Sequence, residues 1–410
     1  MKVIDLFAGG GGLSEGFRQA GFEIVAHVEM DKSACNTLKT REVFYYLKNT
    51  NNLDSYLRYL KKEINRDELF DMIPEEILSR VIQSEINIET LPSLRKRIDN
   101  ILASYDNPKV DLIIGGPPCQ AYSTAGKSRD PYNMQNDKRN YLYFRYIDFL
   151  KYYRPKMFIF ENVKGILTSL DGSVFESLQK YLSLAGYTLD YKILNAKDFG
   201  VSQNRERVIL IGWQKNLNLS YPIFPNENFS TIQELFSDLP SLQSGESIDG
   251  KYAYLKNKNI NNKFIRPDNW VILTQHITRK NNENDLKIYH LAVSTWLNEK
   301  RILKYNELPK NLQTHKNTKS FLDRYKPLKN DDISHTVVAH ISKDGHYYIH
   351  PDLNQNRSIS VREAARLQSF PDDYYFEDSR TAAFKQIGNA VPPLMAYKIA
   401  EVLFDLLNKN

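Results

Sequence analysis

Short apolar runs alternate with amphipathic stretches along most of the first 215 residues. The runs are rich in β-branched and aromatic residues, which is typical of strands buried in a sheet. The stretches between them place apolar residues at helical spacing. This alternation predicts a doubly wound, mostly parallel α/β sheet. We expect strands over residues 2–7, 23–28, 110–114, 157–160, 188–194 and 207–213, and helices over 13–21, 140–153, 172–185 and 393–407.

One interruption of this pattern spans residues 41–105. The segment is polar and helix-like, with Leu94, Ile98 and Leu102 at successive four-residue steps. We therefore expect a helical insertion between the second and third sheet units, largely a solvated excursion from the sheet.

Residues 216–355 differ in composition from the rest of the chain. They are irregular, rich in Asn, Lys and Tyr, and hold seven of the eight histidines. From residue 213 to 335 there are 18 Lys and Arg against 13 Asp and Glu, so we expect a smaller, basic domain. The predicted division is 1–215 for the first domain, 216–355 for the smaller domain, 356–385 for a linking block and 386–410 for a segment that returns to the first domain.

Composition narrows the class of protein. The 410 residues are 41% hydrophobic and 25% charged, and no apolar run reaches the roughly 18 residues of a membrane span. The two cysteines, Cys35 and Cys119, cannot form a disulfide framework, so we expect reduced thiols and a cytoplasmic location. The net charge of +6 permits a polyanionic partner.

A glycine loop follows the first predicted strand, within the segment Asp5–Phe17. It lies at a strand-to-helix turn, where glycine lets a ligand approach the backbone. Glu29, Met30 and Asp31 follow about twenty residues on, and an acidic side chain there can accept hydrogen bonds from ribose hydroxyls. The pair indicates a cofactor that contains a nucleoside, and a nicotinamide dinucleotide remains open at this point.

Three more segments carry candidate chemistry. Residues 115–123 follow a strand with two prolines and then Cys119, which is either a nucleophile or a small buried side chain. Glu161 ends an apolar strand, where a carboxyl group can act as an acid or cap a helix. Arg205 and Arg207 share one strand face by alternation, to bind phosphate, orient a carbonyl or form a salt-bridge ladder.

In order, these four segments resemble the signature blocks DLFAGxGG, PPCQ, ENV and QxRxR of the cytosine-C5 DNA methyltransferases. Residues 357–371 are similar to the family's RxLTxREAARLQxFP block, and residues 386–393 to its GN(S/A)V block. The resemblance covers nearly the whole chain except residues 41–105 and 216–335. It implies a Rossmann-like methyltransferase fold with a smaller, irregular target-recognition domain, and activity as a DNA (cytosine-5-)-methyltransferase.

The resemblance also implies that S-adenosylmethionine binds at the sheet edge, with Glu29 at the ribose hydroxyls and Met30 on the adenine. The family's acidic contact to the adenine amino group has no direct match, because residues 85–89 depart from the usual Asp-Ile; Asn87 is the nearest candidate. The implied cofactor residues are Phe7, Ala8, Gly9, Gly11, Leu13, Glu29, Met30, Asn87, Pro117, Asn389 and Val391.

For catalysis, the resemblance implies that the Cys119 thiolate attacks C6 of a flipped-out cytosine while Glu161 hydrogen-bonds or protonates N3. Arg207 is expected at the cytosine O2, and Arg205 at phosphate or cofactor-side groups. The implied DNA contacts are Ser123, Gln203, Thr336 and Val337.

The implied partner is double-stranded DNA. The resemblance implies that the protein acts as a monomer, that it does not bind a membrane, and that a cognate restriction endonuclease accompanies it. Two alternatives stay open: a transfer-RNA cytosine-C5 methyltransferase, whose branch has a Cys-Phe-Thr segment that this chain lacks, and a catalytically silent DNA-binding relative. A nicotinamide oxidoreductase explains the glycine loop alone.

Three histidines, His340, His346 and His350, invite comparison with a metal site. Without cysteines or closely spaced pairs nearby, we expect no metal. A β-hairpin around Asp344 and Gly345 is the preferred interpretation.

Overall fold

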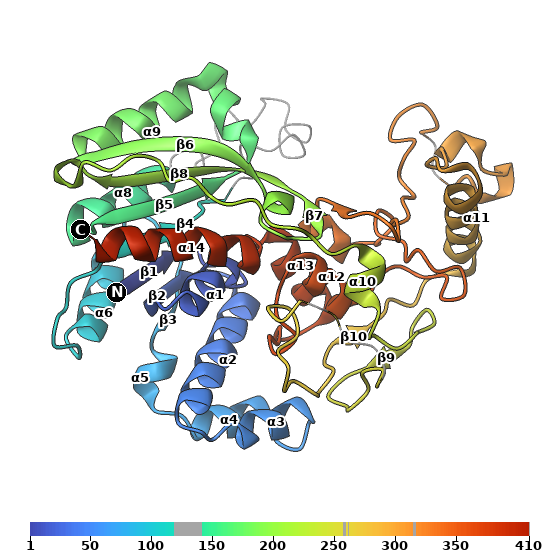
Figure 1. Ribbon diagram of the computed structural model, residues 1–410, viewed down its shortest axis with the longest axis horizontal. Coiled ribbons are helices and arrows are strands. Elements are labelled where there is room, and N and C mark those ends of the chain that lie inside the picture. Colours follow the sequence, from blue (N-terminus) through green and yellow to red (C-terminus); the bar gives the residue numbers. More distant parts are fainter. Residues whose placement is uncertain (119–141, 257–259, 261, 315–316, 410) are drawn as a thin grey trace.

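The computed structural model describes residues 1–118, 142–256, 260, 262–314 and 317–409. Its centre is a seven-stranded sheet in the order β3-β2-β1-β4-β5-β8-β6 (Figure 1). All neighbouring strands are parallel except β8, which is antiparallel to both β5 and β6. The doubly wound, mostly parallel prediction is therefore confirmed. The strands are β1 (Lys2–Leu6), β2 (Glu23–Glu29), β3 (Val81–Gln83), β4 (Leu112–Gly115), β5 (Met157–Asn162), β6 (Tyr187–Asn195) and β8 (Glu206–Gln214).

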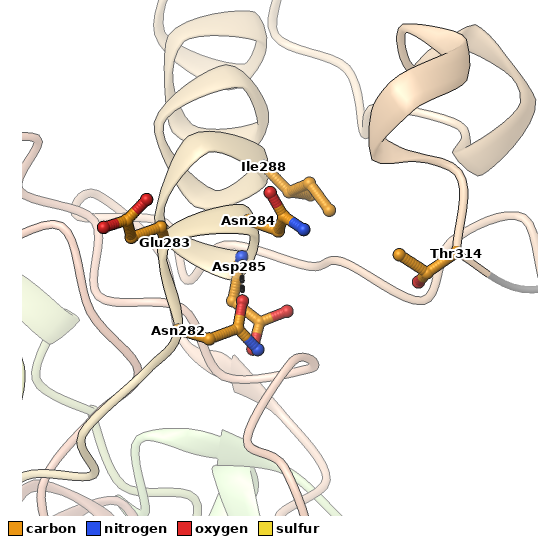
Figure 2. Close-up of a pocket in the computed structure, with 6 residues that line it drawn as sticks. All are labelled: Asn282, Glu283, Asn284, Asp285, Ile288 and Thr314. Atoms are coloured by element: carbon orange, nitrogen blue, oxygen red, sulfur yellow. Dashed lines mark hydrogen bonds between the residues drawn. The ribbon is translucent and has the colours of Figure 1, made fainter.

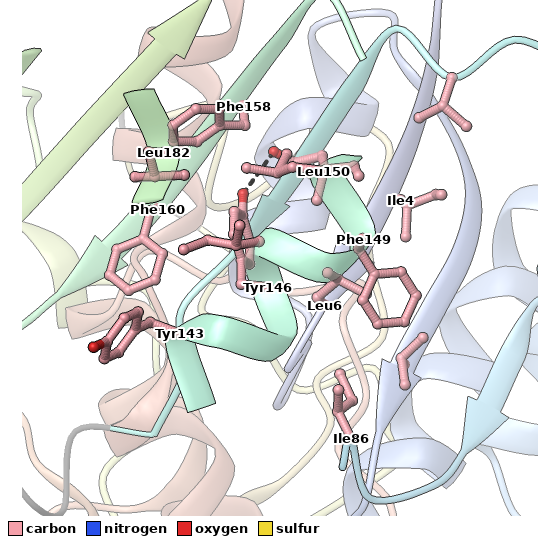
Figure 3. Packing of buried hydrophobic residues seen from close by; sticks show 14 of the residues in the cluster. Ile4, Leu6, Ile86, Tyr143, Tyr146, Phe149, Leu150, Phe158, Phe160 and Leu182 are labelled. Carbon is pink, nitrogen blue, oxygen red and sulfur yellow. Dashed lines mark hydrogen bonds between the residues drawn. The ribbon is translucent and has the colours of Figure 1, made fainter. Parts of the chain in front are cut away.

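Alternating strand residues bury side chains on both faces of the sheet. Ile4 and Leu6 point to the face covered by α6 (Leu91–Leu102), α8 (Leu142–Tyr153) and α9 (Ser173–Leu184), whereas Val3 points to the face covered by α1 (Gly12–Gln19) and α14 (Pro393–Asn408). Figure 3 shows the first of these cores, in which the Tyr146 hydroxyl donates to the carbonyl oxygens of Ile113 and Ile159 at 3.0 and 2.7 Å.

Residues 41–105 are mainly helical, as expected, but they are not a solvated excursion from the sheet. The segment contains β3, which extends the sheet in parallel beside β2, and α6 buries Leu94, Ile98 and Leu102 in the sheet core instead of in a solvated excursion. The helices α2 (Lys32–Asn49), α3 (Asp54–Leu60), α4 (Arg66–Asp71) and α5 (Glu75–Leu78) precede β3. The first three of them share a core with Trp270 and Ile272, which lie about 200 positions later in the chain.

A second lobe lies beside the sheet (Figure 1). One of its cores joins residues 232–273 with 359–390, and a separate core surrounds α11. We define the second lobe as residues 232–389; the predicted domain boundaries remain a proposal. Its elements are α10 (Ile232–Phe236), β9 (Ser247–Ile248), β10 (His276–Ile277), α11 (Glu283–Glu299), β11 (Ser334–His335), α12 (Val361–Leu367) and α13 (Arg380–Asn389).

The expected hairpin around Asp344 and Gly345 is wrong. A 3-10 helix, η8 (Ala339–Ser342), leads into a turn at Gly345, which has a φ of 78°. The histidines serve separate packing roles, since His346 contacts the ring of Tyr325 and His350 lies on Phe236. Within the described ranges, His, Cys, Asp and Glu side chains form no group of three suited to a metal.

None of the described helices combines the length and the apolar character needed to cross a membrane.

Candidate functional site

The carboxyl ends of β1, β2, β4 and β5 meet at one edge of the sheet, because these strands run parallel. The register places Gly115 between Leu6 and Phe160 at this edge. A side chain at Gly115 would overlap the carbonyl oxygen of Leu6. The segments that follow these strands therefore start from neighbouring positions.

Glu29 anchors the glycine loop (residues 8–12) to the end of β2. One carboxylate oxygen accepts from the Gly9 amide at 2.7 Å, and the other accepts from the amides of Met30 and Asp31 at 2.9 and 2.8 Å. Burial raises the pKa of Glu29, and these three amide donors only partly offset that effect. The carboxyl group thus sits at the loop with capacity for a further hydrogen bond.

The glycines of the loop serve two different purposes. An added Cβ at Gly9, whose φ is +54°, would meet nothing within 4 Å, so this position opens onto free space. An added Cβ at Gly11 would lie 2.5 Å from the Tyr374 hydroxyl, and one at Gly12 would overlap the Val391 carbonyl. Gly9 therefore leaves space for a ligand, as expected of the loop. Gly11 and Gly12 instead allow Tyr374 and Val391 to approach the backbone of the loop closely.

The remaining residues expected around the methyl donor divide into exposed and buried ones. Phe7 adopts a left-handed conformation at φ 58° as the chain leaves β1. Leu13 and Val391 are buried in the core beneath α14, and their expected part in the cofactor site stays a prediction. Ala8 packs beside Cys35, and Asn389, the last residue of α13, is exposed.

Two large apolar side chains in the segments that follow β2 and β3 are exposed. Met30, next to Glu29 in the chain, is 61% exposed, and Ile88, in the segment after β3, is 70% exposed. Asn87 is engaged locally, because its side-chain oxygen accepts from the amides of Glu89 and Thr90 at 3.0 and 2.9 Å. Such exposed apolar groups offer a surface for a planar ring.

Glu161 and Arg207 form an ion pair at the end of β5. Arg207 Nε lies 2.9 Å from Glu161 Oε1, and both side chains are mostly buried. The other carboxylate oxygen borders Gly116, where an added Cβ would lie 2.6 Å away. The pair is thus held against the loop that leads to Cys119.

Asn162 fixes the same loop from the neighbouring position. Its buried side chain donates to the Pro117 carbonyl at 3.2 Å and accepts from the Val163 amide at 2.9 Å. Pro117 is itself buried. Cys119 and Ser123 lie outside the described residues.

Arg205 and Arg207 contact different partners. Arg205 lies between β7 (Gln203–Asn204) and β8, and its guanidinium donates to the carbonyls of Val337 and Gly388 at 2.7 and 3.4 Å. Its side chain is 1% exposed. These contacts join the sheet to the second lobe, and the expected contact of Arg205 with phosphate or with the cofactor side stays a prediction.

Gln203 and Val337 belong to the same joint, and their expected contact with DNA stays a prediction. The Val337 amide donates to Gln203 Oε1 at 2.7 Å, and both side chains are fully buried. β7 and β11 pair in parallel here. Thr336 is only partly buried, and its hydroxyl donates to the Asn204 carbonyl at 2.7 Å.

Cys35 is a poor candidate for chemistry. It is almost fully buried, and burial, together with the charge of Glu29, raises its pKa to about 12. Its thiol therefore stays protonated at neutral pH and is not a ready nucleophile.

A pocket on the described surface lies away from the sheet edge, at the first turn of α11 (Figure 2). Asn282 caps this helix, with its side-chain oxygen accepting from the Asp285 amide at 2.8 Å. The carboxylates of Glu283 and Asp285 line the pocket and disfavour a phosphate there.

Comparison with known proteins adds the chemistry of the family. The family model described as C-5 cytosine-specific DNA methylase matches residues 1–73 and 84–405. The chain belongs to this family. The methylase is 43% identical to the type II methyltransferase M.Bpa9945I of Bacillus paralicheniformis, with 100% of this chain and 99% of the relative covered. It is 30% identical to M.FnuDI of Fusobacterium nucleatum, over 99% of this chain and 95% of that relative. The protein is accordingly a DNA cytosine-5-methyltransferase.

Solved structures support the fold. One solved structure is described as a DNA modification methyltransferase encoded within an E. coli prophage. It superposes with a TM-score of 0.66 at 24% identity, covering 100% of this chain and 99% of that one. The Entamoeba histolytica methyltransferase EhMeth gives a TM-score of 0.53 at 17% identity, covering 99% and 98%. The Rossmann-like methyltransferase fold is thus confirmed for the methylase.

Three residues of this edge were not singled out from the sequence. In residues 85–89 only the polar side chains suggest a role, so the sequence gives no reason to choose Ile88. Asn162 follows Glu161 directly, and the carboxyl group of Glu161 is the more obvious candidate for chemistry. Tyr374 carried no sequence signal at all, because its contact with the glycine loop spans more than 360 positions.

Proposed function

We propose that the methylase transfers a methyl group from S-adenosylmethionine to C5 of a flipped-out cytosine within a specific double-stranded DNA sequence, through a covalent bond between Cys119 and C6. The observation that carries this proposal is the Glu161–Arg207 pair against Gly116 at the sheet edge, next to the glycine loop. In this proposal the site for the methyl donor lies next to the Glu161–Arg207 pair, which can hydrogen-bond the cytosine ring.

The residues around the glycine loop fit the methyl donor. The space at Gly9 accepts a ligand, the Glu29 carboxylate has capacity for a ribose hydroxyl, and Met30 and Ile88 offer apolar surface to an adenine. Asn87 keeps its place as a candidate for the adenine amino group. When bound, S-adenosylmethionine supplies a methyl group activated by a sulfonium.

Catalysis then follows from the chemistry of cytosine. The Cys119 thiolate adds to C6, which breaks the aromaticity and delivers an electron pair to C5, while Glu161 hydrogen-bonds N3. C5 takes the methyl group, and the sulfonium leaves as a neutral thioether. Loss of the C5 proton to a base expels Cys119 and restores the ring as 5-methylcytosine. Arg207 orients Glu161 and contacts the cytosine O2.

The target base is unreachable inside a stacked duplex, so the enzyme must extrude it, at a cost of a few kcal/mol. The basic second lobe supports this role by neutralising phosphates, and Thr336 and Ser123 remain candidates for DNA contacts.

The biological setting is proposed from the relatives. Since these are named type II methyltransferases, we propose that the protein is the methylase of a restriction–modification system, acting as a monomer in the cytoplasm beside a cognate endonuclease.

The test is to incubate the protein with S-adenosylmethionine and unmethylated genomic DNA and to sequence the DNA after bisulfite conversion. We expect protected cytosines in one short recurring context, and none with Cys119→Ala. Methylation by Cys119→Ala would refute the nucleophile. An absence of protected cytosines with the natural chain would contradict the DNA substrate, and the same assay on transfer RNA would then identify an RNA enzyme.

A further inference from the structure

A short segment of the second lobe, Asp372–Asp378, supports the glycine loop from behind. The hydroxyl of Tyr374 donates to the carbonyl oxygen of Gly10 at 2.7 Å, and both residues are buried. Burial raises the pKa of Tyr374, so its hydroxyl remains a proton donor at any physiological pH. An added Cβ at Gly11 would lie 2.5 Å from the same hydroxyl oxygen. The backbone of the loop therefore rests directly on this tyrosine.

The helical insertion holds Tyr374 in place through the preceding residue. Arg41 of α2 pairs with the Asp373 carboxylate at 3.0 Å and also donates to the Asp373 carbonyl at 3.2 Å. Tyr56 of α3 donates to that carbonyl at 3.0 Å. The arrangement fixes the backbone on which Tyr374 is carried.

Arg41 also reaches the helix that follows the glycine loop. Its guanidinium donates to both carboxylate oxygens of Glu15 in α1, at 2.6 and 2.8 Å, and lies 4.8 Å from the centre of the Tyr374 ring. All of these side chains are buried or nearly so, which strengthens their mutual attraction. One cation thus ties α1, α2 and the Tyr374 segment together.

The other side of Tyr374 belongs to the second lobe. Its carbonyl accepts from the buried Arg362 at 3.0 Å, and its ring packs against Phe370 and Phe376 with centroids 4.9 and 5.2 Å away. Tyr374 therefore links the core of the second lobe to the glycine loop.

We propose that Tyr374 is a positioning residue for the methyl-donor site, and that the helical insertion, through Arg41 and Tyr56, sets the affinity of this site by fixing the Tyr374 hydroxyl beneath Gly10. This proposal rests on the proposed use of S-adenosylmethionine. It gives the insertion a role in donor binding, although Arg41 and Tyr56 contact Asp373 and Glu15 and not the glycine loop itself.

The test compares three substitutions that each remove one phenolic hydroxyl: Tyr374→Phe, Tyr56→Phe and Tyr59→Phe. Tyr59 is the matched control, because it also lies on α3 and donates to the same segment, at Glu377 with a distance of 2.7 Å, but away from Gly10. Each full-length variant is measured by calorimetry with S-adenosylmethionine and by steady-state kinetics on DNA, alongside its thermal unfolding.

We expect Tyr374→Phe to weaken donor binding by about threefold to tenfold, which is the effect of one buried hydrogen bond, and to raise the KM for the donor with little change in kcat. Tyr56→Phe should shift both in the same direction by a smaller factor. Tyr59→Phe should leave donor affinity unchanged, even where it lowers the unfolding temperature.

Unchanged donor affinity in Tyr374→Phe, or an equal loss in Tyr59→Phe, would overturn the proposal. If Tyr374→Phe does not fold, the comparison of Tyr56→Phe with Tyr59→Phe decides in the same way. Failure of the natural chain to bind S-adenosylmethionine is seen before any variant is made, and it would instead refute the proposed function.

Discussion

At the scale of single residues, Arg205 and Arg207 contact different parts of the molecule. Glu161 and Arg207 meet each other at the edge, whereas Arg205 is turned into the joint with the second lobe. Two arginines only two positions apart therefore have unrelated roles. Strand alternation predicts a shared face, but it does not predict that Arg205 donates to carbonyls of the second lobe while Arg207 pairs with Glu161.

We predict that Glu161→Gln lowers kcat by about 10²- to 10⁴-fold, since the amide can neither carry the negative charge nor exchange a proton at N3. Single-turnover methylation of a duplex measures this directly. Glu206→Gln is the control, because Glu206 is an exposed neighbour that pairs with Lys164 and should retain full activity. A Glu161→Gln enzyme with more than a tenth of the natural rate would remove Glu161 from the mechanism.

At the scale of elements, glycines set how closely helices approach. Gly12 and Gly16 lie on α1 where α14 crosses it, and a Cβ at either would overlap the backbone of the 391–397 segment. The C-terminal helix packs on the first helix for this reason, and the sheet gains its cover on that face.

We predict that Gly12→Ala lowers the free energy of unfolding by about 1–3 kcal/mol, the usual cost of overpacking. Urea denaturation monitored by circular dichroism measures the change. A Gly12→Ala variant as stable as the natural chain would show that the close approach of the Val391 carbonyl is not the reason for Gly12.

The sequence anticipates most of the elements but not all of their partners. The apolar runs that became β1, β4, β5 and β8 are long enough to be recognised by pattern. β3 has three residues and lies among polar helices, so its pattern is too short to register. Buried placement of Gln203 and Val337 depends on a pairing across about 130 positions, which local periodicity does not encode.

At the scale of the whole molecule, buried charges join parts of the chain that are distant in sequence. His27 on β2 lies between Asp5 on β1 and Glu42 on α2, at 3.5 and 3.1 Å, and Glu42 also pairs with Arg18 and Arg80. Burial alone would lower the pKa of His27, but its hydrogen bonds and ionic contacts with the two carboxylates outweigh that effect and raise it.

We predict a pH-dependent contribution of His27 to stability. Because the pKa is raised above its ordinary 6.5, charged His27 stabilises the fold fully below that value, and the contribution disappears as the pH rises through the raised pKa. Each unit of the shift corresponds to about 1.4 kcal/mol. Unfolding of the natural chain and of His27→Gln between pH 5 and about 9 should give a difference that shrinks with increasing pH. A difference for His27→Gln that stays constant over this pH range would contradict the assignment.

The parallel pairing of β7 and β11 has a consequence for how the length of this chain can vary in evolution. Asn204 and His335 lie opposite each other, so the 130 residues between them form a closed excursion with adjacent ends. The entropy of closing such a loop rises only with the logarithm of its length, by about 0.6 kcal/mol for each doubling. Insertions and deletions in the part of this stretch that follows β8 therefore cost little stability and leave β8, with Arg207, paired in the sheet.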